Sequence, residues 1–93
     1  MPLKRLNEEY QKDLEGIRFG MRNEQRMVIC LVTDTALTDA MGGNPTQAER
    51  SEWFIAHRSD IEEAASSKFD QGAFEADGNI RVDTRDLNPR LFC

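Results

Sequence analysis

Hydrophobic residues occupy every second position from Ile17 to Met21, and polar residues or glycine separate them. This two-residue period is typical of a strand that buries one face. After a polar turn at 23–25, residues 27–32 form a continuous apolar run that is rich in β-branched side chains. Two such segments joined by a short polar turn predict an antiparallel hairpin.

A short helix is predicted directly after the hairpin, over residues 35–41. Thr33 or Asp34 can cap its first turn, because their side chains accept hydrogen bonds from free backbone N–H groups. The pair Gly42-Gly43 is expected to end it, since glycine readily adopts the conformation that terminates helices.

A longer helix is predicted from about Thr46 to Gln71. Thr46 and Glu49 have the spacing of a capping box, and Asn44 followed by Pro45 fits a helix start nearly as well. At 100° per residue the large apolar side chains fall close to one line, and acidic side chains fall opposite them. The residues on the apolar line are Phe54, Ile61 and Ala65. The helix is therefore expected to pack on a core through one face.

The two ends of the chain give weaker signals. Residues 79–83 predict a short strand after a turn at Asp77-Gly78, and 84–89 predict a turn or a single helical turn that ends before proline. Residues 1–15 have apolar positions at helical spacing, but their Asn and paired Glu, with no cap, also fit an extended arm. Both alternatives stay open from the residues alone. The apolar positions are Leu3, Leu6, Tyr10 and Leu14.

These elements predict an α+β fold: a small antiparallel sheet of three or four strands, one long amphipathic helix packed on one face, and a short helix. A chain of 93 residues leaves room for one domain. We assign 1–15 to an N-terminal arm or short helix, 16–87 to the single domain and 88–93 to a C-terminal tail.

The charge balance narrows the classes of partner. The chain has 17 acidic and 12 basic residues, a net charge of −5. An acidic protein is a poor general binder of nucleic acid, although Arg18, Arg22 and Arg81 could share one sheet face. The longest apolar run, 27–32, is far shorter than a membrane helix, and polar residues follow Arg5 where a signal peptide needs an apolar stretch. We expect a cytoplasmic protein that binds neither nucleic acid nor membrane.

The order of these segments resembles a known bacterial family. The stretch 54–65, followed by Lys68-Phe69 and by Gly78-Asn79-Ile80-Arg81-Val82, is similar to the pattern of domain of unknown function 1488, and the upstream strands and short helix are similar in order. The resemblance covers roughly residues 16–87. It implies a small α+β fold, favours an extended arm at the N-terminus and implies no activity.

Few residues offer catalytic or metal-binding chemistry. His57 is the only histidine, and Cys30 and Cys93 stand far apart with Cys30 inside a strand, so we expect no disulfide, metal or cofactor. His57 is expected to pack at the edge of the apolar helix face, and Arg58 to pair with Glu62 one turn later. The alternative is that Arg58, with His57 and Glu62, contacts an anion or small ligand.

The leading hypothesis is a non-enzymatic module that binds an as yet unknown protein. The alternative is a small-ligand or anion-binding protein that uses Arg58 and the start of the long helix, and an enzyme is third. Residues 27–32 place apolar side chains on both sheet faces, of which the long helix covers one. The short helix and the arm could cover the other in a monomer. We expect instead a homodimer through Met27, Ile29 and Leu31.

Overall fold

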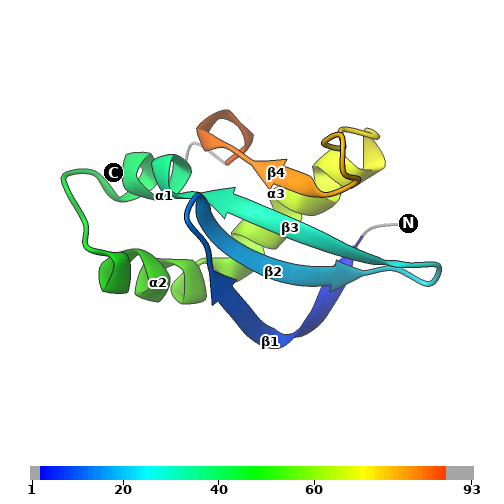
Figure 1. Cartoon of the computed structure of the whole chain (residues 1–93), viewed down its shortest axis with the longest axis horizontal. Helices are drawn as coiled ribbons and strands as arrows, with labels where there is room; N and C mark the ends of the chain where they lie inside the picture. The colour runs from blue at the N-terminus through cyan, green and yellow to red at the C-terminus, as the bar shows by residue number, and fades with distance from the viewer. Residues whose placement is uncertain (1–2, 88–93) are drawn as a thin grey trace.

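The computed structural model describes residues 3–87, which form a four-stranded sheet with helices on one side (Figure 1). The elements in chain order are β1 (Lys4–Lys12), β2 (Gly16–Arg22), β3 (Met27–Thr33), α1 (Asp34–Met41), α2 (Gln47–Ala56), α3 (Arg58–Asp70), β4 (Ile80–Val82) and a 3₁₀ turn (Thr84–Asp86). In Figure 1, α3 lies behind the sheet, whereas α1 and α2 lie near one end of it. The predicted tail 88–93, with Cys93, lies outside the described residues.

The strands lie in the order β1-β2-β3-β4. The predicted hairpin is confirmed: β2 pairs antiparallel with β3 from Arg22 opposite Met27 to Gly16 opposite Thr33. The expected wholly antiparallel sheet is corrected, because β4 runs parallel to β3, with Cys30 opposite Ile80. After β3 the chain passes through three helices and then returns as β4 beside the edge of β3 that β2 leaves free. A crossover connection of this kind is required between parallel neighbouring strands. The α+β fold class is confirmed.

The N-terminal segment is extended, as the family resemblance implies, and not helical. Strand β1 pairs antiparallel with β2, with Lys4 opposite Arg22 at one end and Lys12 opposite Ile17 at the other. The register shifts between Arg5 and Tyr10, and β1 bends away from β2 there (Figure 1). An edge strand that is charged and bulged in this way is a poor template for pairing with other chains.

The predicted helix caps are present. The Thr33 hydroxyl accepts a hydrogen bond from the Ala36 N–H at 3.0 Å and so begins α1, which ends at Gly42 with a φ of 81°. At the start of α2, Thr46 and Glu49 form the reciprocal capping box: the Glu49 N–H donates to the Thr46 hydroxyl, and the Thr46 N–H donates to the Glu49 carboxylate. Two of the free N–H groups near this helix start are thereby satisfied.

The single long helix expected over 46–71 is divided in two at His57. The backbone of His57 has φ −115° and ψ 17°, which ends α2 and starts α3. The division lets α2 pack against α1 while α3 packs against β4 and β1. One straight helix could not make both sets of contacts. The sequence has no glycine or proline near His57 that would indicate the break.

The core lies between the inner face of the sheet and the helices. All three residues of the predicted apolar line, Phe54, Ile61 and Ala65, are fully buried. The Phe54 ring contacts the rings of Tyr10 and Phe19, each with centroids 5.4 Å away. The sheet contributes alternate side chains to this core: Ile17, Phe19, Met21, Val28, Cys30, Val32, Ile80 and Val82.

Two glycines of β2 give a test of the sheet packing. A Cβ on Gly16 would overlap the backbone carbonyl of Val32, whereas a Cβ on Gly20 would meet only the Leu6 side chain, at 2.8 Å. Overpacking costs about 1–3 kcal/mol, and backbone yields less readily than a side chain. We therefore expect Gly16→Ala to lower the free energy of unfolding by about 3 kcal/mol and Gly20→Ala by less than about 1 kcal/mol. Urea unfolding of both variants measures this, and equal losses would contradict the described packing.

Candidate functional site

The outer face of the sheet, which points away from the helices, carries the residues predicted as an interface. Met27, Ile29 and Leu31 alternate along β3 with buried residues of the inner face. Met27 is 60% exposed, and Ile29 and Leu31 are half-buried. From β1, the Leu6 side chain lies against Gly20 on this face. Figure 1 shows this side of the sheet without a helix over it.

The two predicted covers do not close this face. Helix α1 buries Ala36, Leu37 and Ala40 in the core. Of the N-terminal apolar residues, Leu3 is buried in the core and Tyr10 packs against it, whereas Leu14 is 99% exposed. Of these four residues, only Leu6 has its side chain against the outer face. Met27, Ile29 and Leu31 form what we call the apolar strip. Within residues 3–87 no helix or other segment packs over it as a second layer.

Ion pairs lie on both sides of Leu31, and the predicted arginines share this face of the sheet. Arg18 and Arg81 both lie opposite Leu31, on β2 and β4 respectively. Arg18 pairs with Asp13, and this hydrogen bond lowers the pKa of the Asp13 carboxyl. Arg81 pairs with Glu15 at 2.6 Å. These carboxylates offset the positive charges of Arg18 and Arg81.

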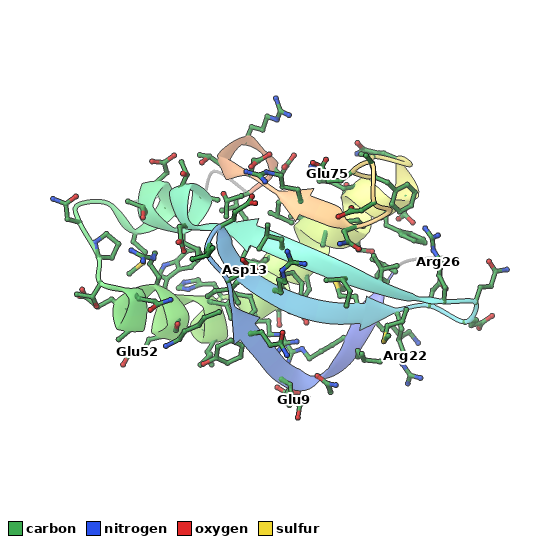
Figure 2. The ribbon with its side chains drawn as sticks, viewed as in Figure 1. Glu9, Asp13, Arg22, Arg26, Glu52 and Glu75 are labelled. Atoms are coloured by element: carbon green, nitrogen blue, oxygen red, sulfur yellow. The ribbon has the colours of Figure 1, made fainter. Side chains whose placement is uncertain are left out.

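Cavities lie on both sides of Ile29. One of about 300 Å³ lies between the bent part of β1 and β2, where Leu6, Tyr10, Arg18 and Gly20 contribute to its walls. A second of about 130 Å³ lies next to Leu31, among acidic and arginine side chains. The outer face is thus hollowed rather than smooth. Figure 2 shows the charged side chains around it, including Asp13 at one end and Arg22 near the other.

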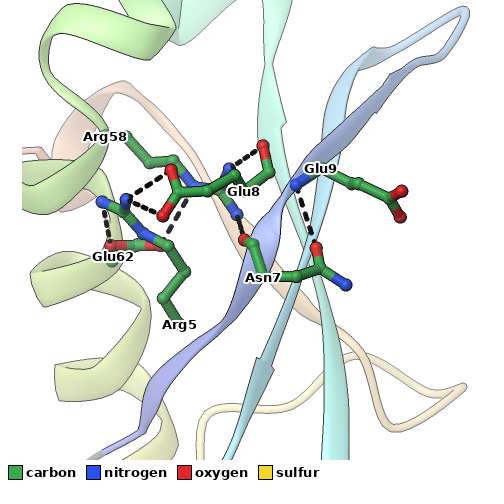
Figure 3. Close-up of polar contacts among 6 residues, drawn as sticks. All are labelled: Arg5, Asn7, Glu8, Glu9, Arg58 and Glu62. Carbon is green, nitrogen blue, oxygen red and sulfur yellow. Dashed lines mark hydrogen bonds and ion pairs between the residues drawn. The ribbon is translucent and has the colours of Figure 1, made fainter.

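Arg58 lies on the other side of the molecule and is buried. Its side chain is 5% exposed, and its Nε donates to a Glu62 oxygen at 3.0 Å. Its Nη1 and Nη2 donate to the backbone carbonyls of Glu8 and Asn7, at 2.9 and 2.8 Å (Figure 3). These carbonyls belong to the part of β1 that loses its register with β2. Arg58 therefore supplies the hydrogen bonds that the bulge takes away from the sheet.

Arg5 completes this network, and no pattern in the sequence predicts its part in it. Its Nε and Nη2 donate to both oxygens of Glu62, at 2.8 and 3.0 Å, and its Nη1 donates to the Glu8 carboxylate (Figure 3). These bonds, with Glu62 foremost, raise the pKa of the Arg5 guanidinium. The carboxylate of Glu62 is thus shared by two guanidinium groups, and the predicted Arg58–Glu62 pair is one half of a larger cluster.

The geometry leaves Arg58 poorly placed for an anion from solvent. All three of its nitrogens have protein acceptors, so a ligand would have to displace one of them. Arg58 also begins α3, and the ten residues of α2, about 15 Å of helix, separate it from Thr46. At that helix start the Glu49 carboxylate already accepts the backbone N–H of Thr46, which lowers the pKa of Glu49.

His57 is a packing residue between the two helices. Its ring stacks on Trp53, with centroids 4.2 Å apart and planes 23° apart. Its Nδ1 lies 3.0 Å from the Trp53 carbonyl oxygen, which can only accept, so Nδ1 carries the proton in this contact. Neither His57 nor Arg58 lines the two cavities beside Ile29, and neither lines a third cavity, of about 300 Å³, whose wall includes Arg5 and Glu62.

Cys30 is a buried thiol on the inner sheet face. Burial, with a smaller effect of the Glu62 charge, raises its pKa to about 12. A thiol with so high a pKa is protonated at neutral pH and is a weak nucleophile. Within residues 3–87 no three His, Cys, Asp or Glu side chains are grouped so that they could hold a metal ion. No helix in the same range is long and apolar enough to cross a membrane.

The molecule is thus a small α+β domain in which helices pack on one face of a curved, mixed four-stranded sheet. A family model described as "Protein of unknown function (DUF1488)" matches residues 4–82, and the chain belongs to this family. It is similar to a crystal structure of a DUF1488 protein of unknown function from Shewanella loihica PV-4, with 26% identity and a TM-score of 0.71, over 87% of this chain and 91% of that one. No curated protein matches the chain.

The buried arginine gives a stability prediction. Arg58→Lys keeps the charge but has one nitrogen where three are used, so the carbonyls of the bulge or Glu62 lose a partner. Breaking a buried pair typically costs about 3–5 kcal/mol, and we expect a loss of about 3 kcal/mol in the free energy of unfolding. Arg22→Lys, at an exposed position, is the matched control and should change stability by less than about 0.5 kcal/mol. Urea unfolding measures both, and equal stability of the two variants would refute the role of Arg58.

The buried thiol gives a pH prediction. Because the folded pKa of Cys30 is above its unfolded value of 9.0, its contribution to stability is complete below pH 9 and is lost as the pH rises toward about 12. In a Cys93→Ser background, the further substitution Cys30→Val should flatten this part of the stability curve. Chemical unfolding at several pH values measures it. The Cys93→Ser protein should also react with a thiol reagent only after unfolding, and rapid reaction of the folded protein would contradict the burial.

Proposed function

We propose that this protein is a non-enzymatic, cytoplasmic module that binds a protein partner through the outer face of its sheet. The observation that carries the proposal is the uncovered strip on β3, where Met27 is 60% exposed and Ile29 and Leu31 are half-buried. A single exposed apolar residue is ordinary, but a contiguous strip ringed by charged groups is typical of a protein-binding surface.

The use made of the reactive side chains supports a binding rather than a catalytic role. His57 is stacked on Trp53, and the thiol of Cys30 is buried with a raised pKa. A nucleophile and a base need to converge at an accessible point, and these two side chains are engaged in packing instead. A free buried thiol also fits a reducing compartment such as the cytoplasm.

The alternative of an anion-binding protein that uses Arg58 and the start of the long helix has less support. The guanidinium of Arg58 is bonded to Glu62 and to two backbone carbonyls. Its cationic face also lies near the rings of Phe19 and Phe54, at 5.8 and 5.5 Å from their centroids. These contacts account for the residue as part of the fold.

A pair of matched variants tests the proposal. Leu31→Glu introduces a carboxylate between Arg18 and Arg81, so it removes the apolar surface at a place where a new charge has partners. Ile55→Glu makes the same kind of change on α2, where Ile55 is 57% exposed. Each protein is used to capture partners from an extract of its native cells, with quantitative mass spectrometry.

We expect proteins captured by the wild type to be retained by Ile55→Glu and reduced at least about tenfold by Leu31→Glu. Circular dichroism of both variants confirms that they are folded. The proposal is wrong if no protein, including the chain itself, is captured specifically, or if Leu31→Glu retains every partner.

A further inference from the structure

We infer that the partner of the outer face is a protein segment in which a short run of acidic residues adjoins large apolar residues. The acidic residues meet the hairpin end of the face, and the apolar residues cover the apolar strip. This inference rests on the proposed function of the face and names the chemistry of its partner. It comes from the positions of the cations that have no carboxylate partner.

Two cations of the outer face are unpaired, and both lie at its hairpin end. Lys4 of β1 lies opposite Arg22 of β2, and Arg22 lies opposite Met27 of β3. Side chains directly opposite each other in an antiparallel pair lie on the same face, so this row shares the outer face. Lys4 and Arg22 are both exposed, and neither forms an ion pair with any of residues 3–87.

The arginines farther along the outer face are already paired. Arg18 donates to Asp13, on the turn before β2. Arg81 pairs with Glu15, from the same turn. The positive charge that remains open to a partner is therefore concentrated beside Met27 and is not spread along the apolar strip.

Arg26 adds a third unpaired cation at the hairpin end, on the helix side of the sheet. Its guanidinium carbon lies 5.3 Å from the centroid of the Phe69 ring and 4.9 Å from that of the Phe74 ring. These rings pack edge to face and hold the guanidinium by cation–π contacts. Glu24, in the hairpin turn, forms no ion pair with Arg26 or with Arg22. Figure 2 shows both arginines at this end of the molecule.

The opposite end of the face favours a protein segment over a polyanion such as nucleic acid. Glu15, Glu75 and Asp77 line the cavity of about 130 Å³ next to Leu31, together with two arginines that are already paired. A phosphate chain laid along the apolar strip would bring its charges toward these carboxylates, and it would leave the apolar side chains without an apolar partner. A few acidic residues that continue into apolar ones match both ends of the face.

The apolar strip is short, which sets the length of the segment. Side chains two residues apart on a strand are about 6.8 Å apart, so the strip from Met27 to Leu31 is about 14 Å long. About four or five extended residues, or about 2.5 turns of helix, cover this length. A peptide of about twelve residues therefore has room for both the apolar and the acidic part.

Selection from random-sequence dodecapeptides displayed on phage tests the inference. Peptides enriched by the wild type should combine Asp or Glu with large apolar residues. Lys4→Glu/Arg22→Glu reverses the charge of the hairpin end and should select basic residues in place of the acidic ones. Lys12→Glu/Arg85→Glu is the matched control, because it changes two exposed cations that lie off the outer face. This control should select the same peptides as the wild type.

One enriched peptide is then synthesised, and its dissociation constant is measured by ¹⁵N NMR titration. Lys4→Glu/Arg22→Glu should weaken binding at least about tenfold, and the control by less than about twofold. A second peptide, with lysine in place of the acidic residues, should prefer the charge-reversed protein to the wild type. Such an exchange of preference separates a direct contact from a loss of folding.

Enriched peptides without acidic residues would overturn the inference, as would equal affinity of the two double variants for the acidic peptide. Tighter binding of the wild type to a single-stranded oligonucleotide of about 20 nucleotides than to the peptide would also overturn it. If Leu31→Glu still loses captured cellular proteins in any of these cases, the partner has other chemistry and the proposed function stands. If the face binds neither peptides nor cellular proteins, both are wrong.

Discussion

The sheet of this protein has apolar side chains on both faces, and the chain provides a helical layer for one. On β3, the side chains of Val28, Cys30 and Val32 are buried beneath the helices. Met27, whose side chain lies on the opposite face of the sheet, is 60% exposed. The β-branched run that makes β3 a stable central strand also creates the second apolar face, because successive side chains point in opposite directions. Association with another protein is the direct way to cover that face, and the proposed function follows from this constraint.

The polar cluster around Glu62 fixes the shape of the edge that borders this face. Arg58 donates to the carbonyls of Asn7 and Glu8 and to Glu62, and Arg5 donates to both oxygens of the Glu62 carboxylate. The bulged part of β1 can therefore separate from β2 while the carbonyls of Asn7 and Glu8 keep hydrogen-bond partners. That departure opens the cavity beside Gly20 on the outer face, so a buried ion cluster on one side of the molecule shapes the proposed interface on the other.

Local signals in the sequence predicted local structure correctly, and the misses all involve contacts between distant segments. The capping box at Thr46 and the β2–β3 hairpin depend on residues a few positions apart. The helical spacing of the N-terminal apolar residues was misleading, because the bulge of β1 interrupts the two-residue period of a strand. The break at His57 and the parallel pairing of β4 depend on how the helices pack against the sheet. Of the Glu62 cluster, the partner four residues away was predicted, and Arg5, 57 residues away, was not.

Two-dimensional ¹⁵N NMR of the labelled protein, recorded at several concentrations and then with an extract of its native cells added, tests the central claim most directly, because it reports each residue separately. If the outer face is the interaction surface, shifts or line broadening will be confined to amides of Leu6, Gly20, Met27, Ile29 and Leu31 and their neighbours, and α2 will be unaffected. Shifts centred on the exposed side of α2 or α3, with an unchanged outer face, would contradict the account.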